Sequence, residues 1–161
     1  MLTVRSVREP RWNNVEHTSL NVWVTFEETA ETLGEMPFTA SPEDCESYGR
    51  DLFARAVALE FGPILEPSTP VLEQAALLTR SRLNAQATAT IAVLQVTLDT
   101  LQDAQRLGLA SEDEVALLPL KQAELDAWCT YRVYLSRLDT QPGFPSAVEW
   151  PAIPVAPLEQ G

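Results

Sequence analysis

A stretch with neither proline nor glycine, from Val71 to Leu107, restricts the fold of this 161-residue chain more than any other part. Apolar or small residues recur in it at steps of three and four, as in a coiled coil with one stutter. They are Leu72, Ala76, Thr79, Leu83, Ala87, Ile91, Leu94, Leu98 and Leu101. A continuous helix of this length would measure roughly 55 Å at about 1.5 Å per residue. It must therefore break, pair with another helix or protrude.

A partner helix is predicted directly after this stretch. Gly108 ends the first helix, and Ser111 with Glu114 forms a capping box that begins the next. Apolar residues resume at Val115, Leu117, Leu118, Leu120 and Leu125. We therefore predict a long helical hairpin. Pro119 predicts a kink or a new helix start within its second arm, because proline removes a helical hydrogen bond.

The second arm ends in an aromatic stripe. Steps of three, four and three place four residues on one helical face, namely Trp128, Tyr131, Leu135 and Leu138, whereas Arg132 and Arg137 lie elsewhere on the last turns. Such a stripe is more often core than interface. Packing within the chain is therefore the preferred interpretation, and a partner-binding face is the alternative.

The chain beyond this stripe is rich in proline. Pro142, Pro145, Pro151 and Pro154, together with Gly143, exclude a helix. We expect an extended tail in which Phe144, Val148 and Trp150 serve as anchors. Packing of Trp150 against the chain's own helices and contact with a partner are equally weighted alternatives, because rigid extended segments are common recognition elements.

The sequence pattern in the first third of the chain predicts β-strands. Residues 2–7 and the run that starts at Ser19 alternate apolar and polar side chains, with Trp23 on the face opposite the apolar one. That apolar face consists of Leu20, Val22, Val24 and Phe26. A loop or wide hairpin starting at Pro10 is expected to join the strands. Two strands alone are only marginally stable in water, so a helix or further strands must cover them.

The covering helix is predicted at residues 41–62. Ser41 would cap it, Pro42 would occupy its first position, Asp44 would supply the capping-box acid, and Gly62 would end it. Its apolar face would consist of Cys45, Tyr48, Leu52, Phe53, Ala56, Val57 and Leu59, and Gly49 would mark a close backbone approach. Three prolines within residues 63–70 indicate a domain boundary. The prediction is an α+β chain with a small β-rich module and one helix (1–66), then the hairpin and tail (67–161).

Composition limits the classes of function. Acidic residues number 23 against 11 basic ones, giving a formal net charge of -12. This charge would repel nucleic acid and anionic membranes, and it is explained either by solubility or by a basic partner. With no run of eighteen apolar residues and no leader-like start, we expect a soluble, cytoplasmic protein. The two cysteines, Cys45 and Cys129, are expected to be small buried thiols.

No pattern typical of catalysis is present in the sequence. His17 is the single histidine, it lacks a partner at metal-ligand spacing, and the glycines form no phosphate loop. The carboxylates of residues 112–114 follow Ser111 at a helix start, where capping and the helix dipole explain them. We therefore expect no enzyme, cofactor or metal site.

Two parts of the chain resemble the tail fibre assembly proteins of tailed bacteriophages, their prophages and pyocins. One part is residues 36–64, MPFTASPEDCESYGRDLFARAVALEFGPI. The other consists of LGLASEDEVALL, then AWCTYRVYLSRLDTQ, then VEWPAIP, which is similar to the family's capped helix, its tryptophan helix and its closing tryptophan-proline motif. The residues that match the family pattern are Trp128, Tyr131, Arg132, Leu135, Arg137, Trp150 and Pro151.

This resemblance implies a chaperone that binds a phage tail fibre protein. It would promote folding and trimerisation of the fibre near the receptor-binding tip, in the cytoplasm of the host bacterium, and in some relatives it stays on the virion. The seven matching residues would then be partner-binding residues. Two alternatives remain open, a structural protein that forms homo-oligomers through the heptad-like stretch and an acidic protein that binds a basic partner.

Overall fold

The computed structural model describes residues 2–155, and the chain divides into two compact units, Met1–Ala75 and Ala76–Gly161. A three-stranded antiparallel sheet and long helices give an α+β fold, as predicted. Each unit is described by itself below. The predicted domain boundary after residue 66 stays a prediction.

The sheet of the first unit has the order β1-β2-β3. Its strands are β1 (Val4–Trp12), β2 (Leu20–Phe26) and β3 (Met36–Ala40), and a 3-10 turn, η1 (Glu27–Thr29), follows β2. The predicted hairpin connection is present, since β1 pairs antiparallel with β2, but it begins after Trp12 and not at Pro10, because Trp12 still pairs with Leu20. The register shifts between Arg8 and Arg11, and this bulge carries the strand past proline. Strand β3 was not predicted.

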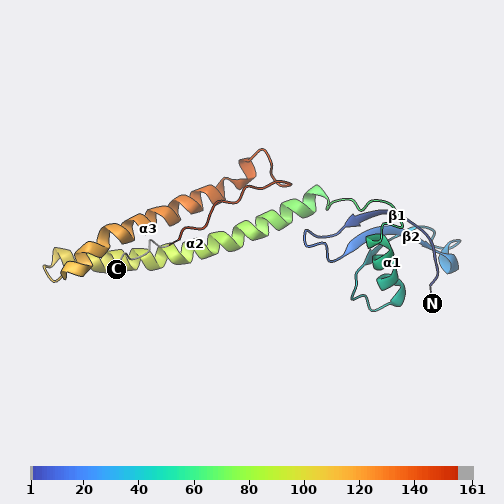
Figure 1. Ribbon diagram of the computed structural model, residues 1–161, viewed down its shortest axis with the longest axis horizontal. Coiled ribbons are helices and arrows are strands. Elements are labelled where there is room, and N and C mark those ends of the chain that lie inside the picture. The colour runs from blue at the N-terminus through green and yellow to red at the C-terminus, as the bar shows by residue number, and fades with distance from the viewer. Residues whose placement is uncertain (1, 156–161) are drawn as a thin grey trace. The chain divides into compact units, whose positions relative to one another are not determined.

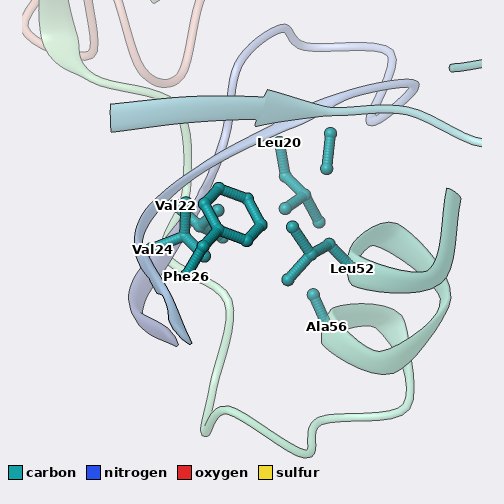
Figure 2. Close-up of a cluster of buried hydrophobic side chains, with 7 residues drawn as sticks. Leu20, Val22, Val24, Phe26, Leu52 and Ala56 are labelled. Atoms are coloured by element: carbon teal, nitrogen blue, oxygen red, sulfur yellow. The ribbon is translucent and has the colours of Figure 1, made fainter. Parts of the chain in front are cut away.

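The core of the first unit lies between β2 and the helix α1 (Ser47–Val57). Leu20, Val22, Val24 and Phe26 alternate along β2 and point toward Leu52 and Ala56 of α1, and all six are buried (Figure 2). Burying a large apolar side chain contributes roughly 1.5 to 3 kcal/mol. Trp23 lies on the opposite face of β2 and remains partly exposed, as the alternation predicted.

The predicted start of this helix at Ser41 was wrong. The helix begins at Ser47, and its N-cap residue, Glu46, makes no side-chain capping bond. The side chain of Asp44 accepts a hydrogen bond from the backbone N–H of Glu46 at 3.0 Å. This local bond stabilises a turn at the place where a helix was expected. Pro42 consequently lies outside the helix.

The predicted end of the helix at Gly62 was also wrong. Leu59 adopts a left-handed conformation with φ of 63°, and the backbone N–H of Glu60 bonds the carbonyl oxygen of Arg55 at 3.1 Å. Leu59 therefore takes the position that glycine normally holds after a helix. As a result Val57 and Leu59, both predicted to be in the core, are exposed.

The predictions for Gly49 and for the two cysteines were confirmed only in part. Gly49 is buried, and a Cβ atom on it would collide with the carboxylate of Asp44, so the expected close approach comes from a side chain and not from backbone. Cys45 is exposed, which contradicts the predicted buried thiol, because it lies before the helix and not on its inner face. Cys129 is half-buried.

Most of the predicted helical hairpin lies in the second unit (Figure 1). Helix α2 (Thr69–Arg106) is continuous, and helix α3 (Glu112–Ser136) packs against it through one cluster of buried side chains. Those residues are Ala87, Ile91 and Leu94 of α2, Trp128, Tyr131 and Leu135 of α3, and Leu138 of the 3-10 turn η2 (Leu138–Thr140). The aromatic stripe is therefore core, as preferred from the sequence.

The connection between the two helices was predicted correctly. Gly108 has a left-handed φ of 71°, and the backbone N–H of Leu109 bonds the carbonyl oxygen of Ala104 at 2.8 Å, so α2 ends in a glycine cap. Ser111 and Glu114 form the capping box of α3. The new helix start predicted at Pro119 was wrong, because α3 runs through this proline.

Candidate functional site

A groove in the second unit runs between α3 and the last described residues. One face of α3 forms its floor, with Ala127, Thr130, Tyr131 and Tyr134 at helical spacing. Residues 149–155, here called the terminal segment, form its wall, and the groove has a volume of about 880 Å³. Residues 148–155 form neither helix nor strand. The extended conformation predicted for them stays a prediction.

A closed turn brings the terminal segment back to α3. The side-chain amide of Gln141 donates to the carbonyl oxygen of Glu149 at 2.9 Å and accepts from its backbone N–H at 2.9 Å. Within the turn, the backbone N–H of Ala147 donates to the carbonyl oxygen of Gly143 at 2.6 Å. A Cβ atom on Gly143 would collide with the Ala147 carbonyl oxygen, so the turn requires glycine there.

The groove exposes apolar side chains. Tyr134 is 56% exposed, Ile153 is 52% exposed and Trp150 is 39% exposed. The charged side chains that line it are those of Arg137 and Glu149. Large aromatic surface beside one guanidinium is the composition typical of protein–protein contacts.

The backbone of the terminal segment offers further contacts. Within residues 2–155, the backbone N–H groups of Trp150, Ala152, Ile153 and Val155 make no hydrogen bond. A bound polypeptide in an extended conformation can pair with such groups, as in recognition by strand addition. Pro151 and Pro154 lack an N–H, so only part of the segment can donate.

Tyr131 links the groove to the hairpin core. Its ring packs edge to face against Trp128, with centroids 5.7 Å apart, and its side chain also lines the groove. The hydroxyl is buried and has no hydrogen-bond partner among residues 2–155. Burial raises the pKa of this phenol, while the positive charge of Arg82 opposes the shift.

The seven residues expected from the sequence to bind a partner fall into three groups. Tyr131, Arg137, Trp150 and Pro151 line the groove. Trp128 and Leu135 are buried between α2 and α3. Arg132 is half-buried and lies outside the residues that line the groove.

Sequence reasoning missed two parts of the groove. Tyr134 and Ile153 line the groove and are each more than half exposed, yet neither was singled out. Tyr134 lies three residues after Tyr131, so helical spacing could have found it. The paired bonds between Gln141 and Glu149 join residues eight apart through a turn, and the sequence gives no signal for them.

Among the described residues, no cluster of three His, Cys, Asp or Glu side chains is arranged to hold a metal ion. His17 instead stacks on Trp12, with ring centroids 4.5 Å apart. In the same part of the chain, residues 2–155, no helix combines the length and the apolar character needed to span a membrane.

Comparison with known families assigns the region that contains the groove to one of them. The sequence model described as "Caudovirales tail fibre assembly protein, lambda gpK" matches residues 63–155, which is more than half of the chain. The chain belongs to this family. The matched residues contain α2, α3 and the groove of this tail fibre assembly protein.

Two curated relatives agree with this assignment. The "Prophage tail fiber assembly protein homolog TfaR" of Escherichia coli (strain K12) is 44% identical over 54 residues, 34% of this chain and 24% of the relative. The "Tail fiber assembly protein" of Escherichia phage lambda is 44% identical over 55 residues, again 34% of this chain and 24% of the relative. The chain thus aligns with about a quarter of the length of either relative. No solved structure matches this tail fibre assembly protein.

Proposed function

We propose that this tail fibre assembly protein binds a phage tail fibre protein through the groove and promotes its folding and trimerisation near the receptor-binding tip. The observation that carries the proposal is an apolar groove inside the region that defines the family. We further propose that it acts without catalysing a reaction. Its action would take place in the host bacterial cytoplasm, and it would remain on the virion wherever the complex with the fibre outlasts assembly.

The groove is suited to an extended apolar segment of an unassembled fibre chain. Tyr134, Trp150 and Ile153 would cover the side chains of that segment, and the unpaired N–H groups of residues 150–155 would bond its backbone. Arg137 would pair with a carboxylate of the fibre, since it makes no ion pair within residues 2–155. Unpaired strand edges of single fibre chains would thereby stay covered until three chains are in register.

The residues that match the family pattern would have different roles in this complex. Trp150, Pro151 and Arg137 would contact the fibre directly, and Tyr131 would contribute the floor of the groove. Trp128 and Leu135 would hold that floor in place from the hairpin core. For Arg132 a contact with the fibre rests on the family pattern alone.

The test is capture of a phage tail fibre protein that is co-expressed with this chain. Trp150→Ala should weaken capture about 30-fold, the effect expected for a central tryptophan that contributes roughly 2 kcal/mol. Trp23→Ala is the matched control, because Trp23 is 38% exposed but lies on the sheet of the first unit. It should capture the fibre as the wild type does.

Two outcomes would contradict the proposal. Equal yields of protease-resistant fibre trimer with and without this protein would exclude the chaperone role. Wild-type capture by Trp150→Ala, together with a large loss in melting temperature, would assign Trp150 to internal packing. The acidic-protein alternative predicts capture that weakens steeply with salt, whereas apolar contacts in the groove predict a modest dependence.

A further inference from the structure

Helix α2 has an exposed apolar face on the side away from α3. Leu78, Val93 and Val96 are exposed there, with Val93 and Val96 about two-thirds accessible at 67% and 66%, and Leu107 is exposed directly after the helix ends. At about 100° per residue, Leu78 and Val96 lie nearly opposite the buried Leu94, and Val93 lies to the side of it. Between Arg82 and Asp99 the helix carries no charged residue, although the chain has a net charge of -12. A solvated face of so acidic a chain would be expected to carry charge.

Some exposed positions of this face pair around one point. Around a point between Ala92 and Val93, two pairs of exposed apolar residues lie at equal distances in sequence. The resulting pairs are Leu78 with Leu107 and Ala89 with Val96. A patch with this property is self-complementary under a two-fold rotation that places two helices antiparallel.

One charged residue at each end of the face fits the same pairing. Arg82 and Asp103 lie at equal distances in sequence from the central point, and both are exposed. Arg82 makes no ion pair within residues 2–155, and Asp103 pairs only with the highly exposed Arg106 one turn away. In an antiparallel pair, each Arg82 would meet the Asp103 of the other copy, so the dimer would hold two such contacts.

We propose that two copies of this chain associate through the outer face of α2, antiparallel, with the two-fold axis between Ala92 and Val93. A second copy is favoured over another occupant because the two apolar pairs, and Arg82 with the oppositely charged Asp103, lie at matching distances from this axis. The apolar part of the face extends for roughly 24 Å at about 1.5 Å per residue. The groove lies on α3 and the terminal segment, so this interface is separate from the proposed fibre site.

Sedimentation equilibrium of the full chain tests the association. The wild type should be a dimer, and Val96→Glu should raise its dissociation constant at least ~100-fold, because each copy would bury an unpaired carboxylate. Val133→Glu is the control, since Val133 is an exposed valine on α3. It should leave the dimer unchanged. A monomeric wild type, or a Val96→Glu variant that associates as the wild type does, would overturn the proposal.

The direction of the pairing has its own test. In a chain with both native cysteines replaced by serine, Leu78→Cys alone and Leu107→Cys alone should form little disulfide, whereas a mixture of the two should form it readily. Disulfide within each single variant would indicate a parallel pair and contradict the proposal. Arg82→Glu should weaken association, and addition of Asp103→Arg to the same chain should restore it.

The same variants separate this proposal from the proposed function. Val96→Glu should still capture the fibre, and Trp150→Ala should still form the dimer. If the outer face of α2 binds added fibre but never a second copy of this chain, the face is a fibre-binding surface and the dimer proposal is overturned.

Discussion

The buried hydroxyl of Tyr131 gives the sharpest prediction on stability. This side chain is 3% exposed, and its oxygen has no hydrogen-bond partner within residues 2–155. Burying a hydroxyl without a hydrogen bond costs about 1 to 3 kcal/mol in proteins. Tyr131→Phe removes the oxygen and keeps the ring that packs on Trp128. We therefore expect the substitution to raise the free energy of unfolding by roughly 1 to 3 kcal/mol.

The assay is thermal and urea unfolding of the full chain, followed by helical circular dichroism, which reports mainly on α2 and α3. For a chain of this size the melting temperature should rise by about 2 to 4 °C per kcal/mol. Tyr134→Phe is the matched control, because its ring is largely exposed on the same helix. It should change stability by no more than about 0.5 kcal/mol.

The reasoning has a clear refutation. If Tyr131→Phe lowers stability by about 1 kcal/mol or more, the hydroxyl must make a hydrogen bond in solution. A phenol that titrates at its ordinary pKa of 10.0, as read from phenolate absorbance, would likewise contradict the burial that raises the pKa of Tyr131.

Three further predictions concern local structure. Ser111→Ala removes the capping box of α3 and should cost about 1 kcal/mol in urea unfolding. Gly108→Ala should cost about 1 to 2 kcal/mol by backbone strain alone, since φ is 71° and no atom lies within 4 Å of the added carbon. Hydrogen bonds from Thr3 lower the pKa of Glu28. The stability that the ionised Glu28 carboxylate contributes is therefore complete above its ordinary pKa of 4.5, and it is lost as the pH falls through the lowered pKa. Acid titration should show less of this loss in Glu28→Gln.

Periodicity and capping chemistry predicted the hairpin well. The α2 pattern, the glycine cap at Gly108 and the Ser111 capping box are local signals, and local bonds alone satisfy them. The failures at α1 arose where two local signals competed. The bond from Asp44 to the Glu46 N–H displaced the expected start, and left-handed Leu59 ended the helix before Gly62.

Features that depend on pairing between residues distant in the sequence could not be predicted from sequence patterns. Strand β3 is five residues long and includes Pro37, so alternation alone does not single it out. The groove depends on the turn closed by Gln141 and Glu149, which no periodicity encodes. Sequence did identify four of its residues, Tyr131 and Trp150 from helical spacing and the proline-rich tail, and Arg137 and Pro151 as binding residues through the family pattern. Only the folded structure shows that these four residues lie around one groove.

Site-specific photo-crosslinking tests most directly whether the groove binds the fibre. A photoreactive amino acid placed at Ile153, which is half-exposed in the groove, should crosslink to the co-expressed fibre polypeptide. The same probe at Val115, which is similarly exposed on α3 outside the groove, should not. Equal crosslinking from both positions, or none from Ile153 in a complex that still forms, would contradict the proposed binding site.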